Sequence, residues 1–431
     1  MNRRALIAAV ALMAAGLAGS APADPELRDG FFGISGIIPD FSYLDGLGAE
    51  CATSGFWIGP SATFLGSNKE ELHTRQMREF VTRGVTPIAT FYLGSVDASA
   101  TEAAATIVAH YTTGSGAADV GAPIRYWEIG DEQNGVWATS CSPEEYARRV
   151  AIVAAGVRAA CPSCVTVLGG LLDGPEMGDW ALIPYLERFL AAGGGEWIDV
   201  YAFHLFGLAR PSPFQPGGPL YDEAATIVDG MRRVLAGYGR EDAPLWVTEM
   251  STFSGGMGPI EQSETEQAAD LVKRFVLLRF LGVDKALWTY VTEPQFEGTG
   301  IGFFDQAGLV YDGIGPYDRG ADVKKLAYGA FARMTDRLGG GTWIDGAREN
   351  GVTWVAFDVR GETVTVLWQD PWIREGPLWI TPAASVTVET MLGEPRLSSA
   401  QTFRLDLDLE PVYVVGASIA VSVSAPALTA P

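Results

Sequence analysis

The sequence contains few of the residues and motifs on which metal-dependent and nucleotide-dependent enzymes rely. Its only histidines are His73, His110 and His204, and none stands in an HExxH or another clustered ligand spacing, which argues against a zinc hydrolase. The GxSxG elbow, the P-loop and the GxGxxG fingerprint are absent, which removes the usual esterase, nucleotide and dinucleotide signals. We therefore expect no cofactor and no catalytic metal, while a structural metal held by loop carboxylates stays open.

Basic residues are also scarce. The chain has 30 Lys and Arg against 52 Asp and Glu, a formal net charge of −22. Such a surface repels nucleic acid and anionic lipid, so we expect neither as a partner. It suits a neutral substrate, although an acidic surface also simply keeps an exported protein soluble.

The apolar stretch at the N-terminus, residues 5–19, is too short to span a bilayer. Arg3 and Arg4 precede it, and Ala21-Pro22-Ala23 follows as an A-x-A cleavage site. No cysteine follows for lipid attachment. The pattern predicts a signal peptide over residues 1–23, and hence a secreted or periplasmic protein without a membrane span.

The chain has four cysteines, which in an oxidising compartment favour disulfides over free thiols. Cys161 and Cys164 lie where a helix is expected to end and a strand to begin, so they predict a local disulfide. The alternative, a redox-active CxxC, lacks a thioredoxin-like βαβ context. Cys51 and Cys141 are then left to pair across space.

Strand-like and helix-like stretches alternate with a regular period over residues 24–340. Helix starts stand out at Asn68, at Ser142-Pro143 and at Ser263, each followed by a glutamate in the first turn. The eight apolar strand candidates lie at residues 30–35, within 50–58, and at 85–93, 125–130, 165–171, 198–203, 245–248 and 285–290. Eight such repeats predict an α/β fold, the (β/α)₈ TIM barrel.

After Gly339-Gly340-Gly341 the pattern changes from helical to alternating. The change predicts a C-terminal all-β sandwich domain over residues 341–420, followed by a tail over residues 421–431. Its expected strands are residues 352–359, 363–368, 378–380, 386–389, 403–409 and 412–415. The domain supports the barrel in the simpler interpretation, whereas exposed Trp372 and Trp379 leave sugar binding open.

Two of the barrel strands end on glutamates. The fourth strand continues into Glu132, and the seventh ends on Glu249. In such a barrel the active site forms at the C-terminal ends of the strands, where both residues fall. Hydrolysis of a glycosidic bond requires a carboxylic acid that protonates the leaving oxygen and a second carboxylate across the anomeric carbon. The pair therefore predicts a glycosidase acting on an oligosaccharide or polysaccharide.

Residues 127–134, Trp-Glu-Ile-Gly-Asp-Glu-Gln-Asn, resemble the W-E-[I/V]-x-N-E-P-N segment of clan A glycoside hydrolases, and residues 246–249 resemble their W-[I/V]-T-E segment. Similarity continues through residues 167–170, residues 203–207 and Trp288. Residues 411–414 resemble the closing strand of the β-domain in glycoside hydrolase family 39 and its relatives. The resemblance implies a retaining mechanism with Glu132 as acid/base and Glu249 as nucleophile.

The sequence departs from the clan pattern immediately before the acid/base. The clan has Asn there, whose amide contacts the 2-hydroxyl of the sugar, and this chain has Asp131. An ionised Asp131 accepts a hydrogen bond but cannot donate one, and it places a negative charge beside Glu132. Gln133 also replaces the usual proline.

Other residues near the strand ends have both a functional and a structural interpretation. We expect His204, at a clan position near the nucleophile, to line the site, with a satisfied core histidine as the alternative. We expect Trp288 to form the floor of a sugar subsite and Tyr290 to contact substrate, and the alternative for both rings is ordinary packing in the core. Glu128 points into the barrel and is expected to pair with a basic side chain. Further aromatic residues at strand ends either line the cleft or pack in the core: Trp57, Trp137, Phe206 and Phe253.

The sequence as a whole predicts an exported retaining O-glycoside hydrolase that uses two glutamates in a double displacement. The alternative, suggested by Asp131, is a carbohydrate-binding protein on the same scaffold whose chemistry has lapsed.

Overall fold

The computed structural model describes residues 30–53, 58–61, 63–136, 139–210, 220–294 and 300–423. The expected signal peptide, Trp57 and Trp137 lie outside these ranges. Within them, no helix combines the length and apolarity needed to cross a bilayer.

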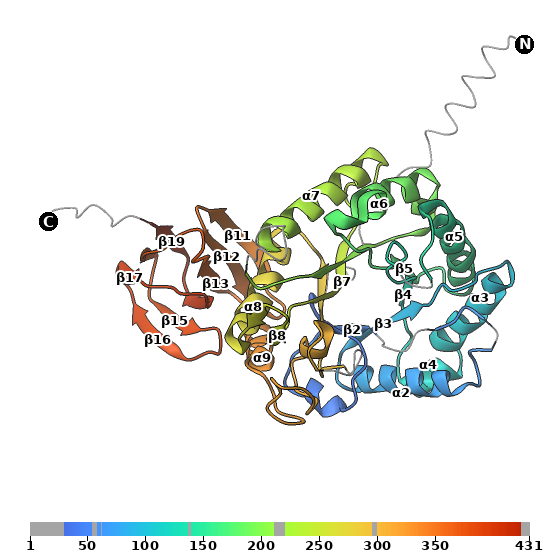
Figure 1. Ribbon diagram of the computed structural model, residues 1–431, viewed down its shortest axis with the longest axis horizontal. Coiled ribbons are helices and arrows are strands. Elements are labelled where there is room, and N and C mark those ends of the chain that lie inside the picture. The colour runs from blue at the N-terminus through green and yellow to red at the C-terminus, as the bar shows by residue number, and fades with distance from the viewer. Residues whose placement is uncertain are drawn as a thin grey trace, which may run out of the picture.

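Eight parallel strands form the barrel on the right of Figure 1. They are β1 (Phe32–Ser35), β2 (Cys51–Thr53), β3 (Thr86–Phe91), β4 (Tyr126–Ile129), β5 (Val165–Leu168), β6 (Tyr201–Phe206), β7 (Leu245–Ser251) and β10 (Lys285–Thr289). Their order in the sheet is β5-β4-β3-β2-β1-β10-β7-β6. Parallel bridges from Val167 to Val200 and from Leu171 to Phe203 join the two edges. Each of the eight expected strands is present.

Helices cover the outside of the barrel. They are α2 (Asn68–Thr82), α3 (Ser99–Thr112), α4 (Ser115–Val120), α5 (Pro143–Ala160), α6 (Leu182–Ala191), α7 (Leu220–Gly237), α8 (Glu264–Phe280) and α9 (Leu326–Leu338). Short 3₁₀ helices occur at Phe41–Leu44, Pro175–Trp180, Gly194–Trp197 and Phe304–Gln306, and a two-stranded ribbon, β8 (Gly255–Met257) and β9 (Ile260–Gln262), follows β7.

The expected helix starts hold with one correction. Ser142 caps α5, and Ser263 forms a reciprocal capping box with Glu266 at the start of α8. Ser67, rather than Asn68, caps α2, because its side chain accepts from the amide of Glu70.

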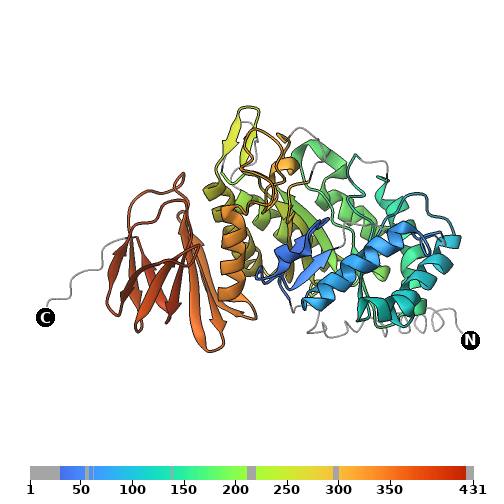
Figure 2. The same cartoon turned by 90° about the horizontal axis from the view of Figure 1, so that it is seen from below.

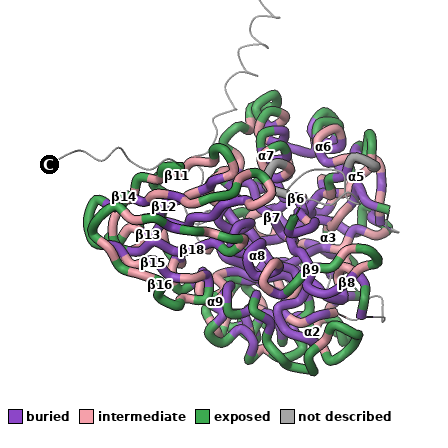
Figure 3. Tube along the Cα trace, turned by 60° about the vertical axis from the view of Figure 1, so that its left-hand side comes forward, coloured by how far each residue is buried: buried purple, intermediate pink, exposed green. Residues whose placement is uncertain are grey.

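The barrel has separate inner and outer cores, because successive side chains of a strand face opposite sides. On β4 the ring of Tyr126 lies inside the barrel, while Trp127 and Ile129 belong to the larger core between strands and helices. Trp246 and Leu287 also fill the interior. In Figure 3 the strands run as buried segments through the middle of the molecule. Since β4 alternates in this way, Glu128 points inward toward the upper end of the barrel.

The C-terminal part is an antiparallel sandwich. A six-stranded sheet has the order β11-β12-β13-β18-β15-β16, and a three-stranded sheet has the order β17-β14-β19. The strands are β11 (Thr342–Glu349), β12 (Val352–Val359), β13 (Glu362–Gln369), β14 (Leu378–Pro382), β15 (Val386–Thr390), β16 (Pro395–Ser399), β17 (Phe403–Leu405), β18 (Val412–Gly416) and β19 (Ile419–Ser422). The predicted sandwich is therefore present, with three strands that the sequence pattern did not indicate: β11, β16 and β19.

The six-stranded sheet is buried on both faces. On β18, Val412 and Val414 face the sandwich core, whereas Tyr413 and Val415 belong to the same core as the barrel helices. Figure 2 shows α9, in orange, standing between this sheet and the barrel. Barrel and sandwich therefore share one continuous apolar core.

Charged side chains are also buried where α8 meets the sandwich. Helix α8 is covered by the barrel on one side and by α9 and the sheet on the other, so its polar side chains are buried as well. Arg274 forms an ion pair with Asp270, and the Lys273 Nζ lies 3.7 Å from Asp370 Oδ1, with all four side chains at most 1% exposed. Burial of a charge requires such pairing.

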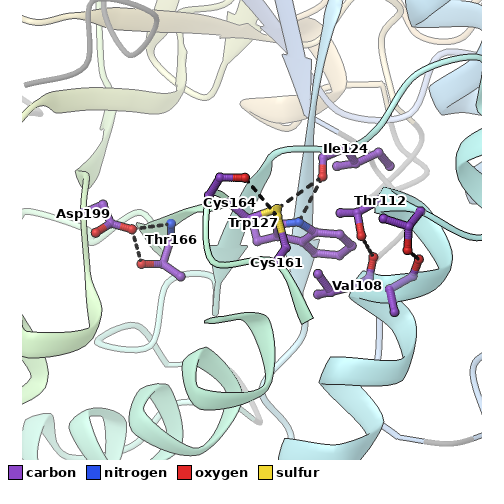
Figure 4. The surroundings of a disulfide bond; sticks show 11 residues. Val108, Thr112, Ile124, Trp127, Cys161, Cys164, Thr166 and Asp199 are labelled. Carbon is purple, nitrogen blue, oxygen red and sulfur yellow. Dashed lines mark hydrogen bonds between the residues drawn. A yellow bond between two sulfur atoms is a disulfide. The ribbon is translucent and has the colours of Figure 1, made fainter. Parts of the chain in front are cut away.

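The cysteines divide into one bonded pair and two free thiols. Cys161 and Cys164 form the predicted disulfide between α5 and β5, and Figure 4 shows it near Trp127, whose indole N–H donates to the carbonyl of Ile124 (3.3 Å). The predicted pairing of Cys51 with Cys141 is wrong, since both are free and buried. Cys51 belongs to the barrel interior, and the Cys141 thiol faces Gln133 Oε1 (3.7 Å) outside it.

Candidate active site

The loop after β4 carries the first glutamate to the C-terminal end of the barrel. Gly130 has φ +91° and Glu132 has φ +46°, so the chain turns sharply as it leaves the strand. The Glu132 amide donates to the carbonyl of Gly170 on the neighbouring strand's extension (3.0 Å). A left-handed conformation at a side chain other than glycine is unfavourable and is typical of functional sites.

His204 on β6 holds this glutamate. Its Nδ1 lies 2.8 Å from Glu132 Oε1, and its Nε2 lies 3.9 Å from Asp131 Oδ1. The imidazole is 1% exposed, whereas the two carboxylates are 12% and 18% exposed. The histidine therefore forms a buried floor beneath two acids that reach solvent.

Glu249 on β7 joins the same group. The register between β6 and β7 shifts between Phe203 and His204, and this irregularity places Glu249 opposite His204. One oxygen of Glu249, one of Asp131 and one ring nitrogen of His204 lie within 4.8 Å of one another. The two strand-end glutamates thus converge on one histidine.

Two hydroxyl groups that the sequence did not suggest support Glu249. Ser35, the last residue of β1, donates to Glu249 Oε1 (3.3 Å), and Thr53, the last residue of β2, donates to Ser35 (2.8 Å). Ser35 and Thr53 are small hydroxyl residues at the C-terminal ends of apolar strands. Their place at the strand ends is the sequence signal that could have identified them. Together they orient the carboxylate from the side opposite His204.

The glycine pair after β5 allows this close arrangement. A Cβ on Gly170 would lie 2.0 Å from His204 Nε2, and one on Gly169 would lie 2.4 Å from the Gly130 backbone. Only glycine leaves room for the imidazole and for the β4 loop at these two positions. The Gly170 amide also donates to Glu128 Oε1 (3.3 Å).

Glu128 lies directly below the site. It is buried and accepts hydrogen bonds from the Thr90 hydroxyl (2.9 Å) and the Gly170 amide. Among the described residues no lysine or arginine forms an ion pair with it, so the expected basic partner is replaced by neutral donors, with His204 as the nearby positive charge. Burial raises the pKa of this carboxyl.

The crowding of acids shifts several pKa values. Burial, together with the charge of Glu132, raises the pKa of Glu249 to about 7 even though His204 opposes the shift. Burial and the charge of Glu249 raise the pKa of Asp131 well above its ordinary value. Burial alone would lower the pKa of His204, but the hydrogen bond with Glu132 and the charges of Glu249, Glu132 and Asp131 raise it to about 10. The site therefore carries a charged imidazole, and the carboxyl groups of Asp131 and Glu249 hold protons more readily than ordinary carboxyl groups.

Tyr290 lies beside the acids and Trp288 does not. Burial raises the pKa of Tyr290, and the charges of Glu249, Glu132 and Asp131 raise it further. Trp288 is fully buried, and its indole N–H donates to the carbonyl of Ala307 (3.2 Å). It packs in the core between barrel and helices, so the expected sugar floor is not formed by this ring.

Aromatic rings stand along one side of the site instead. Phe206 contacts His204 edge-on, and the ring of Phe304 lies between Phe206 and Tyr290, with centroid distances of 5.0 and 6.3 Å. Phe253 is fully buried behind Phe303. The partly exposed rings of Phe206, Phe303 and Phe304 offer an apolar wall that sugars can stack against.

Comparison with known proteins places the fold. No family model and no curated protein sequence matches the chain. A family 39 glycoside hydrolase from the gut symbiont Bacteroides cellulosilyticus WH2 superposes with a TM-score of 0.68 at 16% identity, covering 92% of this chain and 82% of that one. A glucosidase from Croceicoccus marinus superposes with a TM-score of 0.62 at 15% identity. The match covers 91% of this chain and 97% of that one. A family 51 α-L-arabinofuranosidase from Bifidobacterium longum superposes with a TM-score of 0.58 at 13% identity. The match covers 88% of this chain and 89% of that one. The chain therefore has the fold of these structures, a (β/α)₈ barrel with a β-sandwich, as the sequence resemblance implied.

Proposed function

We propose that this protein is an exported retaining O-glycoside hydrolase that cleaves oligo- or polysaccharides. The observation that carries the proposal is the convergence of Glu132 and Glu249 on His204 at the C-terminal end of the barrel. The shared fold supports it, because the similar structures include a glucosidase and an arabinofuranosidase. No observation on the described residues favours the alternative of a lapsed carbohydrate-binding protein.

The mechanism assigns a role to each carboxylate. Glu249 attacks the anomeric carbon while Glu132 gives a proton to the departing oxygen, which leaves a glycosyl ester on Glu249. Glu132 then takes a proton from a water molecule, and that water displaces Glu249 from the sugar. Two inversions at one carbon retain its configuration.

The neighbouring groups position this chemistry. The ring nitrogen of His204 orients Glu132 through the 2.8 Å contact, and Ser35 and Thr53 orient Glu249 from the opposite side. Glu249 must be ionised to attack, and the positive imidazole favours its ionised form.

Trapping of the covalent intermediate tests the proposal. Activated 2-deoxy-2-fluoro xylosides, arabinosides and glucosides are incubated with the enzyme, and the intact mass is measured. We expect an increase of one fluorosugar, located on the peptide that contains Glu249. An adduct on a different carboxylate would refute the assigned nucleophile.

Rescue by azide separates the two roles. In Glu249→Ala the anion enters on the face that the nucleophile vacated and gives a glycosyl azide of inverted configuration. In Glu132→Ala the nucleophile remains and the glycosyl ester still forms. Azide then takes the place of water in the second step, so the glycosyl azide retains the configuration of the substrate. A retained azide from Glu249→Ala and an inverted azide from Glu132→Ala would show that the two glutamates have the opposite roles.

Export is tested separately. We expect the N-terminus of the protein recovered from the periplasm or the culture medium to begin at Asp24. Recovery of the full-length chain in the cytoplasm alone would contradict this part of the proposal.

A further inference from the structure

The active-site histidine has a second nitrogen that the proposed hydrolysis does not use. His204 Nε2 is buried and has no hydrogen-bond partner among the described residues. It points toward Asp131 Oδ1 at 3.9 Å, a distance too long for a direct hydrogen bond. A buried polar nitrogen without a hydrogen-bond partner is costly, and this nitrogen lies among acidic side chains.

The other side of the imidazole is arranged as in metal sites. A histidine that binds a metal through one nitrogen generally donates its other N–H to a carboxylate, which fixes the tautomer and the orientation of the ring. Glu132 Oε1 stands 2.8 Å from Nδ1 and takes this position. Asp131 and Glu249 supply one oxygen each, and these two oxygens and one ring nitrogen of His204 lie within 4.8 Å of one another.

We propose that Asp131, His204 and Glu249 bind a divalent transition metal ion such as Zn²⁺ and that the bound ion inhibits the enzyme. One imidazole nitrogen and two carboxylate oxygens are a donor set that Zn²⁺ accepts at about 2.0–2.2 Å. The ligand atoms now lie within 4.8 Å of one another, so metal binding requires the two partly exposed carboxylates to rotate toward a common point. The ion takes the place of the proton on Nε2.

Inhibition follows from the ligand set, and this part rests on the proposed function. A Glu249 oxygen bound to the ion cannot attack the anomeric carbon. Substrate and metal therefore compete for one site. The site would make hydrolysis respond to the concentration of free transition metal where the enzyme works.

A second acidic group in the molecule provides the contrast. Glu293, Asp312 and Asp318 also lie within 4.8 Å of one another, but Lys325 forms an ion pair with Glu293 and already supplies a cation there. This second group carries no metal proposal. It offers a matched control, because it contains the same type of oxygen ligands without a histidine.

The test is calorimetric titration of the untagged mature protein with ZnCl₂, accompanied by absorption spectra with Co²⁺. We expect one site per chain and a Co²⁺ spectrum typical of a nitrogen ligand. Asp131→Asn is expected to weaken Zn²⁺ binding at least about tenfold, while Asp312→Asn leaves it unchanged. Glu249→Gln, which also preserves side-chain shape, is a second ligand variant in case one of the substitutions prevents folding.

Several results would overturn the proposal: no binding of Zn²⁺ at millimolar concentration, loss of binding in Asp312→Asn, or full affinity in both ligand variants. Inhibition is measured in parallel as a rise in apparent KM with Zn²⁺, and inhibition that substrate does not relieve would refute competition at this site. The protein could also bind Zn²⁺ in a manner that depends on Asp131 and hydrolyse no glycoside. That result would support the metal site and refute the proposed function, so the metal site and the function can fail separately.

Discussion

Buried charges occur in two regions of the molecule, and they are organised differently. At the junction of α8 and the sandwich, Asp270 and Asp370 are matched by Arg274 and Lys273 in a closed environment. In the active site, four carboxyl groups surround the single cation His204, and three of them are partly exposed. Burial shifts pKa values in both regions, raising that of Asp270 and lowering that of Lys273 to about 8 at the junction. A shifted pKa alone therefore does not mark a functional site.

The largest effect is expected in the active site. Glu249→Ala should lower kcat by at least about 10⁴-fold, because the nucleophile is lost, while the free energy of unfolding should not decrease. The measurements are hydrolysis of an activated aryl glycoside and urea denaturation. Hydrolysis equal to that of the parent would remove Glu249 from the mechanism.

The matching change at the junction should act on stability. Arg274→Met leaves Asp270 buried without its cation and removes donors to the carbonyls of Leu205 (2.8 Å) and Gly207 (3.0 Å). We expect a loss of about 3–5 kcal/mol in the free energy of unfolding by urea denaturation. A variant as stable as the parent would show that the pair is dispensable.

Removing both charges of one junction pair sharpens the comparison. Lys273→Met combined with Asp370→Leu should leave the free energy of unfolding unchanged or raise it by about 1–4 kcal/mol. The reason is that the double variant has no desolvation penalty for this pair. Lys273→Met alone should be destabilising. Unfolding curves of both variants and the parent measure this, and additive losses in the double variant would contradict it.

The pH profile is expected to show the smallest effects. Glu249 must be ionised and has a pKa of about 7, so kcat/KM of the parent should fall about tenfold per unit as the pH drops below 7. Ser35→Ala removes a hydrogen bond to the ionised carboxylate and should move this acid limb to higher pH by at most about one unit. A shift to lower pH would mean that Ser35 stabilises the protonated form instead.

The barrel could be predicted because its strands are continuous apolar runs separated by well-marked helix starts. The sandwich was predicted less completely, because the strands that were missed lie at the edges of its sheets. The missed strands β11 and β16 are the two edges of the six-stranded sheet, and β19 is an edge of the small sheet. Edge strands bury less of their side chains, so their apolar alternation is weak: β11 is exposed along much of its length.

Within the site, the residues with distinctive chemistry could be predicted and the orientation of apolar ones could not. Glu132, Glu249, Asp131 and His204 meet as expected from their strand ends. Trp288 was misplaced because β10 is buried on both faces, so the sequence pattern does not show which of Leu287 and Trp288 points inward. Ser35 and Thr53 act through contacts between strands far apart in sequence, which no local pattern reveals.

The six-stranded sheet that is buried on both faces also bears on how this chain can be divided. Val355, Phe357, Val366 and Trp368 belong to the core of the barrel helices, so cutting the chain near Gly340 would expose a broad apolar surface on α8 and α9. The sandwich is thus no detachable module, despite its separate architecture. In evolution and in engineering alike, the two parts would be inherited, transplanted or lost together.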